Sequence, residues 1–147
     1  MLGGVVVLAA GCRRRGATEP MEEGAYERAP EDLDNKLAYA ARAKVPEAVQ
    51  VEVFRGVAME EDETQAFGAN LAGGRCYWLV GVAEESVKEL AIYVYDETGT
   101  RVDARKNTEL PVMRVCPIVP ARHEIKVVVP AGKGGFEVGL YTTRDAQ

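Results

Sequence analysis

The chain of 147 residues contains a single serine and a single histidine, Ser86 and His123. A serine nucleophile needs a base within hydrogen-bond reach, and that base is usually a histidine. Ser86 lies in a Glu-Glu-Ser segment between two apolar runs, and His123 begins another run shortly after Pro120. Neither residue has the strand-turn-helix context of a nucleophile elbow. We therefore expect two unrelated residues and a protein that is not an enzyme.

Carboxylates are more numerous, and the densest run covers residues 60–63, Glu-Glu-Asp-Glu. Oxygen ligands of this kind bind calcium, but a tight calcium loop has Asp at alternating positions and an interspersed Gly. The run lacks both features, so a solvated loop between strands is the simpler interpretation. A zinc site would need several His or Cys ligands, which are not available once the cysteines are assigned. We expect no metal and no cofactor.

A second acidic segment, Asp96-Glu97-Thr98-Gly99, also invites a calcium interpretation. It has the composition of a hairpin turn. In such a turn Asp accepts hydrogen bonds from local backbone amides, and Gly adopts a positive φ. A turn is therefore the expected role of this segment.

The first of three cysteines, Cys12, follows an uncharged apolar run at residues 2–10 and the small residues Ala9-Ala10-Gly11. The run is too short to span a bilayer as a helix, but it fits the apolar region of a secretory signal. The segment resembles the bacterial lipobox. That resemblance implies that residues 1–12 form a lipoprotein signal and that Cys12 is the lipidated mature N-terminus. The alternative is a buried N-terminal strand with an incidental cysteine.

The lipobox resemblance implies an exported protein anchored in the cell envelope, at the outer membrane. The basic residues 13–15 would then lie near anionic headgroups, which attract them. An oxidising compartment favours joining the remaining cysteines, Cys76 and Cys116. Cys76 begins one expected strand and Cys116 ends another, so a bridge requires Cα atoms within about 7 Å. The alternative is two separately buried thiols.

The chain after Cys12 divides into three parts. Residues 13–30 are polar and rich in Gly, Pro and Glu, which is typical of a flexible tether. Residues 31–45 predict a short helix, with acidic residues in the first turn, an apolar stripe at helical spacing and basic residues at the end. This helix is expected to pack on the domain. Residues 46–147 form the domain itself.

The hydrophobic period changes from about 3.6 to 2 after Pro46. About eight short strands separated by turns follow, which predicts a mainly β, antiparallel β-sandwich of jelly-roll type preceded by a short helix. Cys76, Trp78, Val80 and Val82 share one face of their strand. We expect that face to pack against Leu90, Ile92 and Val94. The expected strands contain residues 49–53, 67–71, 76–82, 90–94, 112–116, 125–129 and 136–140, with a short one near residue 101.

Three tyrosines form the candidate ligand face. If Leu90, Ile92 and Val94 point inward, Tyr93 and Tyr95 point outward, and Tyr77 has the outward parity on its own strand. Three tyrosines on one outer face could stack against sugar rings or a partner protein. We expect instead that the N-terminal helix or the second sheet covers them.

The order of these motifs resembles the bacterial pre-peptidase C-terminal type of sandwich, over roughly residues 51–143. The resemblance is carried by Gly-x-Cys before an aromatic strand, Leu-x-Ile-Tyr-Val-Tyr-Asp-x-x-Gly, Val-x-x-Val-Cys-Pro at residues 112–117, and a closing hairpin with a Gly-rich turn. In particular, it resembles versions found in lipoproteins of unknown function. Such domains are exported, non-catalytic accessory modules.

A formal net charge of −5 argues against a nucleic-acid partner, because phosphate binding needs a clustered basic surface. Taken together, these features predict a lipid-anchored, non-catalytic binding or structural module of the cell envelope. Its partner would be an envelope protein or polymer. The alternative is a carbohydrate-binding module that uses the tyrosine face.

Overall fold

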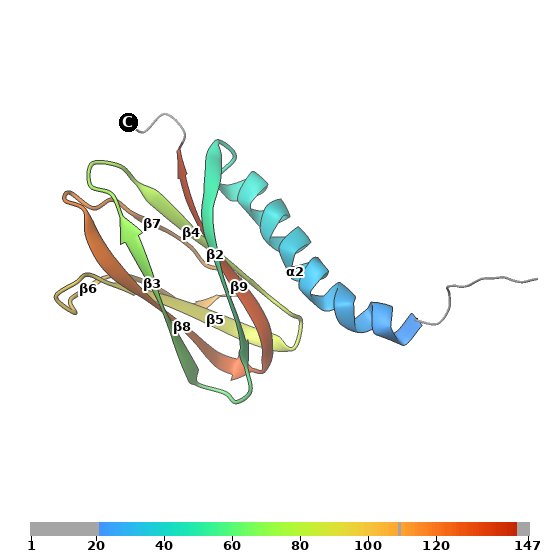
Figure 1. Ribbon diagram of the computed structural model, residues 1–147. Coiled ribbons are helices and arrows are strands. Elements are labelled where there is room, and N and C mark those ends of the chain that lie inside the picture. Colours follow the sequence, from blue (N-terminus) through green and yellow to red (C-terminus); the bar gives the residue numbers. More distant parts are fainter. Residues whose placement is uncertain (1–20, 109, 144–147) are drawn as a thin grey trace, which may run out of the picture. The chain divides into compact units, whose positions relative to one another are not determined.

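The computed structural model describes residues 21–108 and 110–143, with side chains for residues 32–106 and 110–143. The chain separates into two compact units, Met1–Asp32 and Leu33–Gln147. One helix precedes the strands, which account for most of the second unit (Figure 1). The elements are α2 (Met21–Lys44), β2 (Ala48–Ala58), β3 (Glu63–Leu71), β4 (Tyr77–Ala83), β5 (Val87–Tyr95), β6 (Arg101–Thr108), β7 (Val112–Val115), β8 (Ala121–Gly132) and β9 (Gly134–Thr143).

The eight described strands form two four-stranded antiparallel sheets packed face to face (Figure 1). One sheet has the order β2-β9-β4-β7 and the other the order β3-β8-β5-β6. The pairs are nested: β2 pairs with β9, β3 with β8, β4 with β7 and β5 with β6. This nesting is the strand order of a jelly roll. The predicted antiparallel sandwich is therefore confirmed.

The core between the sheets is apolar, and it arises from the alternation along each strand. Inward positions of the two sheets interdigitate, as expected for face-to-face packing. Phe54, Phe67 and Phe136 meet at one point of this core, with ring centroids 5.2 Å apart for Phe54–Phe67 and 6.4 Å for Phe67–Phe136. Other buried members are Leu71, Tyr77, Leu79, Leu90, Ile92, Val94, Met113, Ile125, Val127, Val138 and Leu140.

A second apolar cluster covers the outer face of the β2-β9-β4-β7 sheet. Residues 33–44 of α2 place an apolar stripe there, as the helical spacing predicts. The cluster comprises Leu33, Leu37, Ala40, Ala41 and Val45 from the helix and its end, with Val80, Val82 and Tyr141 from the sheet. The second half of the helix therefore packs on the domain, as expected.

The expected packing of β4 is wrong. Val80 and Val82 lie beneath the helix, whereas Tyr77 and Leu79 face Leu90 in the core. β4 is a central strand whose two faces are both covered, so both sets of alternate residues are apolar. A strand that is buried on both faces shows no alternation of apolar and polar residues, so its sequence does not indicate which side faces the core.

The helix begins at Met21, before the expected start at Glu31. Part of the predicted tether, residues 21–30, is therefore helical. The polar composition that suggested a tether also contains Glu, Ala, Met and Arg, which are strong helix formers. Within residues 21–108 and 110–143, no helix combines the length and the apolar character needed to cross a membrane.

The disulfide between Cys76 and Cys116 is present, and the two Cα atoms are 4.0 Å apart. Tyr77 pairs with Val115 in the ladder between β4 and β7, so the two cysteines are the next residues along these neighbouring strands. Arg114 is exposed, because Met113 and Val115 are the inward residues of β7. The bridge therefore needs no inward arginine. It joins the ends of the two strands at one end of the sandwich.

Candidate ligand face

The outer face of the β3-β8-β5-β6 sheet is the accessible face of the sandwich. The second half of α2 packs on the other sheet, and Ala66, Arg122 and Glu124 of this sheet are exposed. Tyr93 and Tyr95 of β5 lie on this face and are half-buried. The expectation that the helix or the second sheet covers these two tyrosines is therefore wrong. They remain open to solvent along one side.

Tyr77 does not belong to this face. Its side chain is 5% exposed and lies in the core between the sheets. Its hydroxyl oxygen accepts a hydrogen bond from the Ala72 amide at 2.9 Å, at the end of the core. The expected group of three tyrosines is thus reduced to two, because Tyr77 and Leu79, and not Val80 and Val82, are the residues of β4 that face the core.

Neighbouring strands place charged side chains beside the two tyrosines. Tyr93 pairs with Lys126 of β8, and Tyr95 pairs with Glu124 of β8 and Arg101 of β6. Lys126 Nζ lies 4.9 Å from the centroid of the Tyr95 ring. Arg101 Cζ lies 6.0 Å from the centroid of the Tyr93 ring. Exposed cation–π contacts contribute about 0.5–1 kcal/mol each, so a ligand could displace these flexible cations at small cost.

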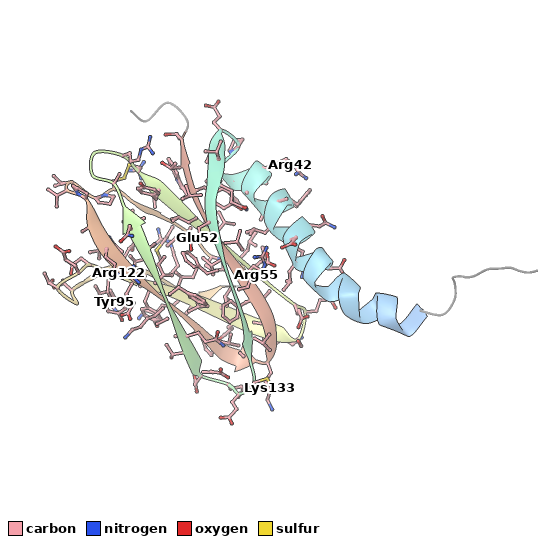
Figure 2. The ribbon with its side chains drawn as sticks, in the orientation of Figure 1. Arg42, Glu52, Arg55, Tyr95, Arg122 and Lys133 are labelled. Atoms are coloured by element: carbon pink, nitrogen blue, oxygen red, sulfur yellow. A yellow bond between two sulfur atoms is a disulfide. The ribbon has the colours of Figure 1, made fainter. Side chains whose placement is uncertain are left out.

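A hollow of about 470 Å³ lies beyond the end of β5. Neither tyrosine lines it, but Asp96, which follows Tyr95, and Glu124, which pairs with Tyr95, both do. Arg122 lines it, and the Arg122 guanidinium occupies the space that a side chain at Gly68 would fill. Figure 2 shows Arg122 and Tyr95 near one another on the β3-β8-β5-β6 side of the sandwich. The lining combines strand residues with the β5–β6 turn and includes Gly68, Asp96, Glu97, Gly99, Arg122 and Glu124.

The β5–β6 turn that borders the hollow is held by Asp96. Its carboxylate accepts hydrogen bonds from the Thr98 hydroxyl at 2.6 Å, the Thr98 amide at 2.9 Å and the Thr100 amide at 3.0 Å. These bonds, the Thr98 hydroxyl first, lower the pKa of Asp96. Gly99 has a φ of 87°, which favours glycine. The predicted hairpin turn is confirmed, and it fixes a carboxylate at the rim of the hollow.

His123 and Ser86 lie at opposite ends of β8 and do not form a site. His123, near the start of β8, is 5% exposed, and its Nδ1 lies 3.2 Å from the carbonyl oxygen of Ala121. Ser86 lies in the β4–β5 turn, where its carbonyl oxygen accepts a hydrogen bond from the Lys133 amide just beyond β8. No proton can pass directly between two side chains separated in this way.

The acidic run at residues 60–63 forms a turn between β2 and β3. Glu63 Oε1 accepts a hydrogen bond from the Met59 amide at 2.7 Å, and Glu61 Oε2 accepts one from the Gly132 amide at 3.1 Å. Two of its carboxylates therefore tie backbone segments together. Among residues whose side chains are described, no group of three or more His, Cys, Asp or Glu side chains is arranged to hold a metal ion.

Sequence reasoning did not find Arg122, Glu124 and Lys126 as members of the face. Their polar alternation on β8 was visible, since they occupy every second position from residue 122 to residue 126. What the sequence did not reveal was the pairing of β8 with β5, which places these side chains beside the tyrosines. Cys12 lies outside the described residues.

Comparisons with known proteins place this chain by its fold. No family model matches the sequence, and no curated protein matches it. The Yersinia pseudotuberculosis-derived mitogen is similar in structure, with a TM-score of 0.50, 7% identity and coverage of 66% of this chain and 89% of that one. The pre-peptidase C-terminal domain of the Bacillus anthracis collagenase has a TM-score of 0.48 and 14% identity, over 60% and 87% of the two chains.

A family 4 carbohydrate-binding module gives a TM-score of 0.40 at 9% identity, covering 71% of this chain and 83% of that one. At 7% identity the likeness to the mitogen shows a shared fold and nothing about ligands. The chain is therefore placed by its architecture alone, as an antiparallel β-sandwich preceded by one helix.

Proposed function

We propose that this protein is a non-catalytic binding module of the cell envelope and that it binds an envelope polysaccharide on the β3-β8-β5-β6 face. One observation carries the proposal. Of the two sheets, one has its outer face covered by α2, while the other leaves Tyr93 and Tyr95 accessible. A hollow lined by Arg122 follows at the end of β5, next to Tyr95's neighbours Asp96 and Glu124. An apolar ring next to fixed polar groups is the usual composition of a small-ligand site.

The chemistry of the face suits sugar rings. A tyrosine ring offers a flat apolar surface to the C–H groups of a sugar, and its hydroxyl adds a polar contact. Arg122 supplies several N–H donors in a planar fork, and the carboxylates of Asp96, Glu97 and Glu124 supply acceptors for hydroxyl groups. A surface with cations and anions in similar number favours a hydroxyl-rich ligand over a highly charged one.

The rigidity of the face favours binding as well. Tyr93 and Tyr95 lie on the central strand β5, which is paired on both sides, with β8 and β6. The Asp96 carboxylate holds the adjoining turn through three hydrogen bonds. Side chains fixed before binding lose less conformational entropy when the ligand arrives.

The second part of the proposal is that a lipid anchor holds the domain in the cell envelope. Lipidation of Cys12 would hold the domain at a membrane surface through the segment that precedes it. The Cys76–Cys116 bridge supports an oxidising compartment, where disulfides persist. A module held close to the envelope polymer needs only weak affinity, because tethering raises the effective concentration.

Co-sedimentation with insoluble polymers tests the function. The full chain is mixed with purified peptidoglycan sacculi, chitin or cellulose, and the fraction in the pellet is measured over a polymer series. We expect retention by at least one polymer, with at least a tenfold loss of affinity in Tyr95→Ala and in Arg122→Ala. A tenfold change in Kd corresponds to about 1.4 kcal/mol of binding free energy, which is the expected contribution of one aromatic or bidentate contact.

Tyr39→Ala is the matched control. Tyr39 is a tyrosine on α2 that is 71% exposed and lies away from the candidate face. Its removal should leave retention unchanged. Equal retention of wild type, Tyr95→Ala and Arg122→Ala, or failure of every polymer to retain the wild-type chain, would refute the proposed face.

A further inference from the structure

Glu137 is a buried carboxylate on the sheet face that α2 covers. It lies on β9, the strand between β2 and β4, and its side chain is 2% exposed. Leu33 of α2 packs over Gly135, where a Cβ would lie 3.4 Å from the leucine Cδ1. The ring of Tyr141 covers Gly139, where a Cβ would come within 2.6 Å of that ring. Glu137 lies between the two glycines on the same face of the strand, so it is enclosed on both sides.

Only one of the two Glu137 carboxylate oxygens has a partner. Arg55, the residue opposite on β2, donates a hydrogen bond from Nε to Oε2 at 3.1 Å. The other oxygen, Oε1, has no hydrogen-bond partner among the described residues. An ionised carboxylate that loses its hydration without a replacement for each oxygen is costly. A proton on Oε1 removes the charge and with it most of this cost.

The helix shares the same arginine. Arg55 Nη2 donates a hydrogen bond to Asp34 Oδ1 of α2 at 3.2 Å, and Figure 2 shows Arg55 on the side of the sandwich that faces α2. When Glu137 is ionised, two carboxylates share one guanidinium, and like charges this close resist double ionisation. When Glu137 is protonated, it can donate a hydrogen bond to Asp34. Burial first, and then this interaction, raises the pKa of Glu137 to about 7, and the same interaction lowers the pKa of Asp34.

The other polar groups near Glu137 are engaged elsewhere. Lys36 of α2 donates a hydrogen bond of 2.7 Å to the last backbone carbonyl of β4. The Tyr141 hydroxyl accepts one of 3.3 Å from a side-chain amide of β2, and Glu84 accepts one of 2.8 Å from a backbone amide of β9. Val82, which is opposite Glu137 on β4, is apolar. Asp34 on α2 and Arg55 on β2 are therefore the groups whose charges act directly on Glu137.

We propose that Glu137, Arg55 and Asp34 form a proton-dependent latch, which holds the second half of α2 on the sandwich when Glu137 is protonated and weakens when Glu137 is ionised. Undocking the helix exposes Glu137 to water, where it titrates near its ordinary pKa of 4.5, whereas in the docked state it titrates at about 7. The proton therefore stabilises docking fully below about pH 4.5. This stabilisation is lost as the pH rises through about 7.

The latch acts on the helix that joins the N-terminal residues to the strands. Its opening would uncover the apolar patch that Val80, Val82 and Tyr141 form on the outer face of the β2-β9-β4-β7 sheet. The proposed ligand face belongs to the other sheet. The latch can therefore be tested without a ligand, and its failure would leave the proposed function untouched.

Hydrogen exchange of the full chain tests the latch at pH 5.5 and pH 8.0. The quantity compared is the protection factor, in which the intrinsic exchange rate at each pH is divided out. We expect the amides of residues 34–44 to be less protected than those of β5 and β8 at both pH values, because the helix undocks without unfolding of the whole domain. Their protection should fall at least tenfold, or by about that factor, from pH 5.5 to pH 8.0.

Three variants separate the latch from a general effect of pH. Glu137→Gln can still accept a hydrogen bond from Arg55 and donate one to Asp34, so the protection of α2 should change by less than about threefold between the two pH values. Asp34→Asn should give an intermediate change, because Glu137 then has the guanidinium to itself. Glu47→Gln makes the same chemical change at an exposed carboxylate just after α2 and should keep the full wild-type change.

Three results would overturn the latch. The first is protection of α2 that does not depend on pH in the wild-type chain. The second is equal protection of α2 and the strands, which would mean that the helix opens only with the whole domain. The third is a full wild-type change in Asp34→Asn, which would mean that the helix carboxylate has no part in the effect.

Discussion

Glu137 of β9 accepts a hydrogen bond of 3.1 Å from Arg55 of β2 on the sheet face that α2 covers. The Glu137 side chain is 2% exposed, and among the described residues its second oxygen, Oε1, has no hydrogen-bond partner. Arg55 also donates to Asp34 of α2 at 3.2 Å. One arginine therefore links the helix to a buried carboxylate of the sheet.

This arrangement predicts that stability falls as the pH rises. Burial first, and then the neighbouring Asp34, raises the pKa of Glu137 from 4.5 to about 7. The folded state therefore binds the proton more tightly than the unfolded state does. The resulting stabilisation is complete below about pH 4.5 and is lost as the pH rises to about 7, a change of up to about 3 kcal/mol in the free energy of unfolding.

Denaturant unfolding between pH 4.5 and 8 measures this change. Glu137→Gln keeps the shape without the charge, so its free energy of unfolding should vary less over this range and exceed that of the wild type at pH 8. Glu52→Gln, an exposed change on β2, is the control. The lowered pKa of Asp34 acts only at more acidic pH and does not interfere. A wild-type slope retained in Glu137→Gln would contradict the assignment.

Tyr77 and Tyr93 should respond differently to truncation. Tyr77→Ala removes a ring from the core and should lower the free energy of unfolding by about 3–5 kcal/mol. Tyr93→Ala removes a half-exposed ring from the open face and should cost about 1 kcal/mol or less. Thermal or chemical unfolding of both variants checks the difference. A loss of several kcal/mol in Tyr93→Ala would show that this tyrosine is covered.

The disulfide closes a loop between positions 40 residues apart and should contribute about 4 kcal/mol by restricting the unfolded chain. The Cys76→Ser, Cys116→Ser double variant should therefore unfold at lower denaturant concentration by that margin. Mass spectrometry of the alkylated, non-reduced protein gives a direct check. Alkylation of both thiols in the mature protein would show that the bridge does not form in the cell.

Lipidation of Cys12 predicts that Cys12→Ala releases the protein from membranes. Buried acyl chains contribute about 0.8 kcal/mol per CH₂, and more than one chain is needed for stable attachment. Fractionation of cells followed by a high-salt wash measures the effect. Full retention of Cys12→Ala in the washed membranes would contradict lipid anchoring.

The positions of all eight strands could be predicted from the sequence because turns and the change of period mark them. The β8 alternation, with Ile125 and Val127 inward and Glu124 and Lys126 outward, corresponds directly to the structure. The facing of β4 could not be predicted, since Val80 and Leu79 are equally apolar and equally buried. The polarity of a residue indicates whether its side chain is buried, but it does not indicate whether the second sheet or the helix buries it.

The residues of the candidate face could likewise be predicted only in part. Tyr93 and Tyr95 were recognised from their outward parity, whereas Arg122 belongs to a strand distant in sequence. It reaches the face only because β8 lies between β3 and β5 in the jelly-roll order. That order depends on long-range pairing, and no local pattern near residue 122 specifies it. The start of α2 was missed for a different reason, since a polar helix and a polar tether share one composition.

The most direct test of the central claim is to map the bound ligand onto the domain by NMR. The ¹⁵N-labelled chain is titrated with oligosaccharides released from the polymer that retains it. We predict that the largest amide shift changes occur in β5, β8 and the 96–99 turn, around Tyr95 and Arg122. Changes concentrated on the β2-β9-β4-β7 sheet or in α2, with the 96–99 turn unaffected, would contradict the assignment of the ligand face.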